Sequence, residues 1–136
     1  MRLIYKTISY WCVIIFCCFS PQITWADEMQ QIKSTIDLLK EKQVLSKPLM
    51  LKGQTKTYDS WEIIASSDGT LELVSGTFTD YGNWWMKGNQ WCRKFDVAHD
   101  GSTSCYTINH LEGNKYLLEE VNGNKSLEAT VTFARK

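Results

Sequence analysis

The sequence lacks any block of like charge, since 15 Lys and Arg residues are spread among 15 Asp and Glu residues. Nucleic-acid binding needs basic side chains gathered on one face, and attachment to an anionic membrane needs a polybasic surface. We therefore expect no nucleic-acid partner and no charged attachment to a membrane. Linkers, low-complexity tracts and clear internal repeats are also missing, so a chain of 136 residues suits one domain.

Long hydrophobic runs are missing as well. The longest one, residues 8–19, is shorter than the ~20 residues that a membrane-spanning helix needs. It follows two basic residues and ends at Pro21, which is the layout of a secretory signal peptide. We predict that residues 1–26 form this signal and that cleavage follows Ala26; the alternative is an uncleaved membrane anchor. Residues 27–136 would then be a single domain with no membrane span.

Cysteine becomes scarce once that segment is removed, because only Cys92 and Cys105 remain of the five. An even pair in an exported chain favours a disulfide, since the compartment is oxidising. Two cysteines are too few for a structural zinc site, and their spacing from His99 and His110 fits no zinc-finger pattern. We expect a Cys92–Cys105 disulfide, no metal site and no cofactor.

Residues 29–45 have apolar side chains at helical spacing, namely at Met29, Ile32, Ile36 and Leu39. The pattern predicts one amphipathic helix that ends before Pro48. Its apolar face could pack on its own domain or bind a partner, and the spacing fits both.

From residue 49 onward, short runs alternate with turn residues, and all eight glycines lie there. Such spacing predicts a mainly β fold, either a small antiparallel barrel or a sandwich, with about eight strands. The candidate strands are residues 49–51, 56–58, 61–66, 70–74, 76–79, 83–87, 90–95, 103–109, 115–121 and 124–133.

Three glycine-containing turns predict the register of these strands. The turn at 67–69 pairs Ser66 with Thr70, and a tight turn at Asn122-Gly123 pairs Val121 with Asn124. Because side chains alternate between faces, each hairpin then has one apolar face. The first face holds Trp61, Ile63, Ala65, Leu71 and Leu73, and the second holds Tyr116, Leu118, Leu127, Ala129, Val131 and Phe133.

The third turn, Gly88-Asn89, lies in the segment with the most tryptophan. It pairs Trp84 with Arg93 and Trp85 with Cys92, so these two tryptophans point to opposite faces. The core face then holds Trp84, Met86, Trp91, Arg93 and Phe95. Pairing Cys92 with Cys105 adds Tyr106 and Ile108 to the same face.

Arg93 is the exception on this apolar face, because a guanidinium there is costly unless it is paired or reaches water. One interpretation is that it stacks on Trp84 or Trp91 and extends to solvent. The other is that it anchors a carboxylate-bearing ligand inside a barrel mouth, flanked by aromatic rings. The candidate ligand-binding residues are Arg93, Trp84, Trp91 and Tyr106.

Catalytic residues are not predicted. Ser102, Ser104, His99 and Asp100 are residue types found in hydrolases, but no nucleophile-elbow, HExxH or phosphate-loop pattern is present. The chain is therefore expected to be a non-enzymatic module that binds a small ligand or an envelope protein. The alternatives are a small secreted hydrolase that uses His99 or His110, and a structural or inhibitory module that acts through an exposed sheet edge.

One family resemblance supports this expectation. Gly82-x-Trp84, Trp91-Cys92-x-x-Phe95, Cys105-Tyr106 and Gly113-x-x-Tyr116 resemble a pattern in small secreted bacterial β-domains of unknown function. The resemblance covers roughly residues 61–120. It implies an exported, periplasmic envelope protein and supports the disulfide. The predicted fold is in the style of the lipocalin and avidin barrels.

Overall fold

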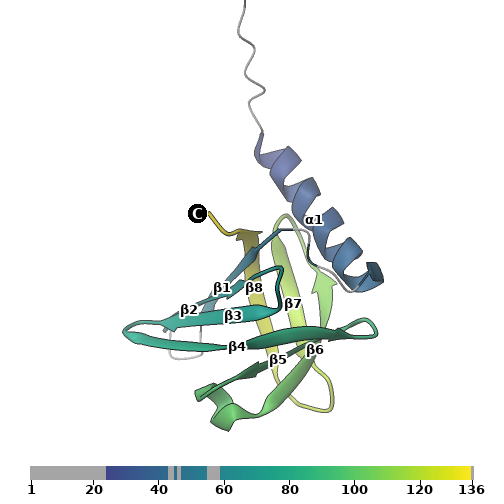
Figure 1. Cartoon of the computed structure of the whole chain (residues 1–136). Helices are drawn as coiled ribbons and strands as arrows, with labels where there is room; N and C mark the ends of the chain where they lie inside the picture. Colours follow the sequence, from purple (N-terminus) through teal and green to yellow (C-terminus); the bar gives the residue numbers. More distant parts are fainter. Residues whose placement is uncertain (1–23, 43–44, 46, 55–58, 136) are drawn as a thin grey trace, which may run out of the picture.

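The chain folds into one helix followed by a closed antiparallel β-barrel (Figure 1). A computed structural model describes residues 24–42, 45, 47–54 and 59–135. Helix α1 (Trp25–Lys42) lies across one end of the barrel, and the short turn η1 (Ala98–Gly101) lies at the other end. The strands are β1 (Leu49–Gln54), β2 (Ser60–Ala65), β3 (Thr70–Ser75), β4 (Phe78–Lys87), β5 (Gln90–Phe95), β6 (Thr103–His110), β7 (Lys115–Glu120) and β8 (Ser126–Phe133).

A barrel rather than a sandwich forms because β1 pairs with β8 as well as with β2. The prediction that residues 76–79 and 83–87 are separate strands was wrong, since residues 78–79 and 83–87 both belong to β4, while residues 76–77 form the turn before it. Gly82 lies in the middle of β4, and this position requires glycine because a Cβ there would collide with the carbonyl oxygen of Lys94 on β5. The expected strand at 56–58 lies outside the described residues.

Two of the three predicted turns are confirmed. Ala65 pairs with Leu71 beside the first turn, and Lys87 pairs with Gln90 at Gly88-Asn89. Gly88 has a positive φ of 61°, which a side chain would strain. All the residues assigned to the core face around Gly88-Asn89 are buried, whereas Trp85 is exposed.

The prediction of the turn at Asn122-Gly123 was only half right. The register is as predicted, with Tyr116 opposite Ala129, but the loop spans residues 121–125 rather than two residues. The N–H of Val121 donates to the carbonyl of Cys105 on β6, so Val121 does not pair with Asn124. The strand ladder therefore ends at the Glu119–Ser126 pair.

Helix α1 begins four residues before the predicted start because Thr24 caps it. The Thr24 hydroxyl donates to the Asp27 carboxylate over 2.8 Å, and the Asp27 N–H donates back to that hydroxyl oxygen. The predicted apolar face is confirmed: Ile32, Ile36 and Leu39 are buried in the barrel core. The helix therefore packs on its own domain and closes that end of the barrel.

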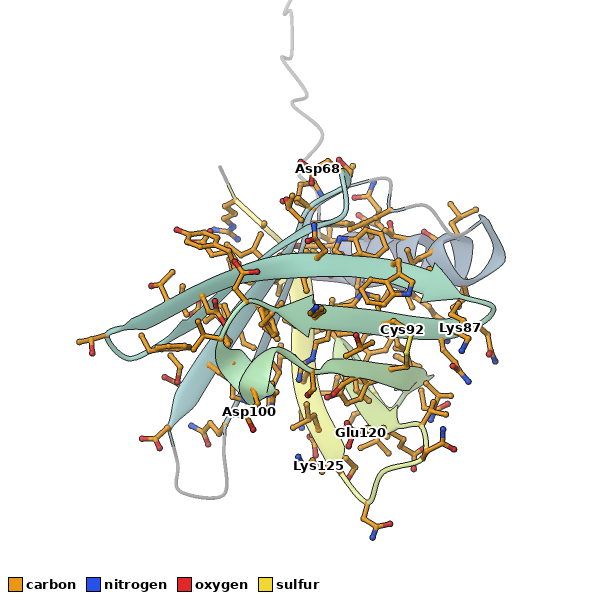
Figure 2. All side chains as sticks on the ribbon, turned by 60° about the horizontal axis from the view of Figure 1, so that its bottom comes forward. Asp68, Lys87, Cys92, Asp100, Glu120 and Lys125 are labelled. Carbon is orange, nitrogen blue, oxygen red and sulfur yellow. A yellow bond between two sulfur atoms is a disulfide. The ribbon has the colours of Figure 1, made fainter. Side chains whose placement is uncertain are left out.

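The disulfide between Cys92 and Cys105 is confirmed and joins β5 to β6, where the two residues are directly opposite (Figure 2). It lies on the outer face of the sheet. The neighbouring residues Trp91 and Tyr106 are also paired, and they point into the barrel. The cross-link thus fixes the strand that carries Arg93 against the strand that carries Tyr106.

Candidate ligand-binding cavity

Arg93 lies inside the barrel on β5, opposite Trp84 of β4 and Ser104 of β6. The residue is only 4% exposed, so the interpretation in which its side chain extends to solvent is wrong. Taking a guanidinium out of water costs several kcal/mol, on the order of the free energy that holds a whole domain together. Its surroundings therefore have to provide compensating interactions.

Those interactions come mainly from aromatic rings, and they do not give every N–H of the guanidinium a hydrogen-bond partner. The Arg93 Nη2 donates to the Tyr106 hydroxyl oxygen over 3.0 Å. Its guanidinium carbon is 5.0 Å from the ring centroid of Tyr106, 5.3 Å from that of Phe95 and 6.0 Å from that of Trp91. Within the described part of the chain, no carboxylate forms a salt bridge with Arg93, and its Nε is buried without a hydrogen-bond partner.

Beside Arg93 is a cavity of about 210 Å³, which we call the Arg93 cavity. A cavity of roughly 150 Å³ accommodates benzene in other proteins, so this one has room for a substituted ring or a short chain. Most of its wall is apolar, and Arg93 and His99 are the residues in it that can carry positive charge. It is lined by Trp61, Ile63, Leu73, Ser75, Arg93, His99 and Leu127.

His99 reaches this cavity because the η1 turn is held against the barrel end by Asp80. The Asp80 carboxylate accepts hydrogen bonds from the backbone N–H groups of Ala98 (2.6 Å) and Val97 (3.1 Å). The bond from Ala98 is the main reason that the pKa of Asp80 is lowered. His99 and Asp100 both have a φ of 57°, a conformation that costs a non-glycine residue roughly 1–3 kcal/mol.

His99 is exposed although it lines the cavity, and its electrostatic environment is set by partial desolvation and by four charged side chains. Burial and then the positive charges of Arg93 and Lys125 lower the pKa of His99, while Glu120 and Asp100 act in the opposite direction. Asp100, Glu120 and Lys125 all lie at the η1 end of the barrel (Figure 2). Together these effects shift the imidazole toward its neutral form relative to a free histidine.

Neither histidine is paired with a serine in the described ranges. Ser102 donates to the backbone carbonyl of His99 over 2.6 Å, not to its ring. His110 Nε2 hydrogen bonds to the carbonyl of Gly113, and its ring packs on Tyr116 with centroids 5.1 Å apart. His110 does not line the Arg93 cavity.

A second hollow lies at the helix end, but it is far smaller. Its volume is about 20 Å³, which is enough for a single water molecule. Trp84 and Tyr116 line it together with Ile36 and Leu39 of α1. Burial raises the pKa of Tyr116, and the negative charge of Asp37 adds to this effect. The side chains of α1 therefore already fill this end of the barrel.

The four predicted ligand-binding residues are thus divided between two regions. Trp91 and Tyr106 lie beside Arg93, but neither of them lines the Arg93 cavity, and Trp91 also lines the hollow at the helix end. The Trp84 Nε1 donates to the carbonyl of Ser66 at the helix end. Sequence reasoning placed Trp61, Ile63 and Leu73 in the core but did not assign them to a cavity. His99 was considered as a catalytic residue or a zinc ligand but not as part of a ligand cavity, since nothing local in the sequence places its ring beside Arg93.

No helix in the ranges described is long and apolar enough to cross a membrane. The same residues contain no group of three or more His, Cys, Asp or Glu side chains placed to hold a metal ion. No protein-family model matches the chain, and no curated protein and no solved structure matches it either. The interpretation of the site therefore rests on its own geometry.

Proposed function

We propose that this chain is an exported, non-enzymatic binding protein of the bacterial envelope that holds a small apolar carboxylate in the Arg93 cavity. The observation that carries the proposal is the buried guanidinium of Arg93, whose Nε has no hydrogen-bond partner within the described residues and which lines a cavity of about 210 Å³. An anionic group in the cavity would give this charge the ion pair that its surroundings do not provide.

The chemistry of the lining favours a carboxylate on an apolar body. An N–H group of the Arg93 guanidinium can donate to one carboxylate oxygen, and charge-assisted hydrogen bonds of this kind are stronger than neutral ones. The Tyr106 hydroxyl, which does not line the cavity, accepts from Nη2 and leaves the other N–H groups of the five that a guanidinium carries for a ligand. Ile63, Leu73 and Leu127 would cover the apolar body of the ligand.

The closed barrel supports a binding role over an interaction through a free strand. Each of the eight described strands has a neighbour on both sides, so none of them presents an unpaired edge to a partner.

The envelope location is supported by the Cys92–Cys105 disulfide, which persists in oxidising compartments. N-terminal sequencing of the exported protein tests this part: we expect a start at Asp27 or within a residue or two of it, and a membrane-bound product that begins at Met1 would contradict it.

Calorimetric titration with three probes tests the binding function. Benzoate and hexanoate combine an anionic group with an apolar body that fits the cavity, whereas benzyl alcohol has the ring without the charge. We expect the two carboxylates to bind at least tenfold more tightly than the alcohol, because a hydrogen bond to a charged group contributes about 1.5–3 kcal/mol. Equal affinity for all three, or no binding of any, would contradict the proposal.

A further inference from the structure

The Arg93 cavity contains a second group that can become cationic. His99 lines the same cavity as Arg93, and it enters from a different element, the η1 turn, whereas Arg93 enters from β5. The two side chains thus approach the cavity from separate parts of the chain. A ligand in this cavity lies within reach of both.

We infer that His99 is the second anion-binding group of the site, and that the ligand carboxylate lies between the Arg93 guanidinium and the His99 imidazole, so that binding is coupled to uptake of one proton by His99. This inference rests on the proposed function. It makes the site a binder of carboxylates whose affinity depends on the acidity of its compartment.

The direction of this coupling follows from the charges around His99. In the free protein, burial together with Arg93 and Lys125 lowers the pKa of His99, and Glu120 and Asp100 only partly oppose them. A carboxylate placed beside the ring would raise this pKa, since an opposite charge within about 4–6 Å shifts a pKa by roughly 1–3 units. A higher pKa in the complex than in the free protein means that binding takes up a proton and becomes tighter as the pH falls.

Backbone geometry provides a way to test His99 without disturbing the turn. Its φ of 57° lies in the left-handed region, which asparagine adopts more readily than most residues. His99→Asn should therefore keep the η1 turn while removing the titrating ring. His110→Asn is the matched control, because His110 lies outside the cavity.

The experiment is calorimetric titration of benzoate between pH 5.5 and 7.5, repeated at pH 6.5 in two buffers with different heats of ionisation. This range keeps benzoate ionised, since carboxyl groups titrate near pH ~4. We expect about tenfold tighter binding at pH 5.5 than at pH 7.5 and measurable proton uptake in the wild type and in His110→Asn, because each unit of pKa shift corresponds to a tenfold change in affinity. In His99→Asn the pH dependence should fall below about twofold and proton uptake should disappear.

Two outcomes would overturn the inference, and they differ in meaning. If benzoate binds the wild type equally at both pH values without proton uptake, or if His99→Asn keeps the full pH dependence, His99 is not part of the site while the binding function stands. If benzoate binds at neither pH, the proposed function fails and this inference fails with it.

Discussion

The carboxylate of Asp80 on β4 accepts a 2.6 Å hydrogen bond from the backbone N–H of Ala98, and this bond begins the turn that carries His99. Asp80 is buried, and its second oxygen accepts from the N–H of Tyr81. One side chain thus connects the start of β4 to the loop between β5 and β6. It holds His99 at the cavity although the turn itself is strained.

We predict that Asp80→Asn weakens this turn, because an amide offers a single oxygen where the carboxylate offers two. Backbone amide exchange at Val97 and Ala98 should become faster, and the melting temperature should fall. Asp96→Asn is the control, since Asp96 is exposed on the same loop. Unchanged exchange at Val97 and Ala98 in Asp80→Asn would show that Asp80 does not hold the turn.

The hydrogen bonds to Asp80 also predict that the stability of the folded protein depends on pH. The pKa of Asp80 in the folded protein is lower than its ordinary value of 3.8, so its ionised form stabilises the fold. This stabilisation is fully present above about pH 3.8 and is lost as the pH falls through the folded-state pKa. Thermal unfolding of the wild type should therefore show a decline below pH 4 that is smaller in Asp80→Asn. An identical decline in both proteins would rule this contribution out.

Two adjacent leucines of α1 test whether the helix is part of the core. Leu39 is 3% exposed and lines the hollow at the helix end, whereas Leu38 is 39% exposed. Leu39→Ala should lower the free energy of unfolding by about 2–5 kcal/mol, because it leaves a cavity in a packed core. Leu38→Ala should change it by less than about 0.5 kcal/mol. Equal effects in chemical denaturation would mean that α1 does not close the barrel as described.

The disulfide should contribute a large share of the stability. Its two cysteines are 13 residues apart, and closing a loop of this size stabilises a chain by roughly 3 kcal/mol in the chain-entropy model. We expect the double variant Cys92→Ala/Cys105→Ala to lose about this amount in chemical denaturation. Alkylation of both thiols in the oxidised wild type without reductant would contradict the cross-link.

Much of the barrel could be predicted from the sequence because short turns fix the register of neighbouring strands. Gly88-Asn89 alone placed Trp84, Arg93 and Cys92 correctly. β4 was divided in two because Asp80 and Gly82 have low strand propensity. Both residues make contacts that the sequence does not show. Asp80 caps η1, and Gly82 allows β5 to approach β4 closely.

The cavity was harder to predict than the fold. Arg93 was identified because it interrupts an apolar face, which is a local pattern. The place of His99 depends on a turn with positive φ at His99 and Asp100, and that turn is held by a carboxylate 18 residues away from Ala98. No local signal reports such a long-range contact, so His99 was considered only for its chemistry.

The central claim is that Arg93 binds the carboxylate of a ligand, and two neighbouring side chains on β5 allow a direct test. Arg93 points into the barrel, whereas Lys94 is exposed on the outer face. Arg93→Met keeps an apolar stem and removes the charge, and Lys94→Met removes a charge from the outside only.

The measurement is the affinity for benzoate of the wild type and both variants, with the melting temperature of each. We predict that Arg93→Met loses at least tenfold in affinity while its melting temperature stays the same or rises, because a buried charge is costly, and that Lys94→Met binds like the wild type. Undiminished benzoate binding by a folded Arg93→Met protein would contradict the claim.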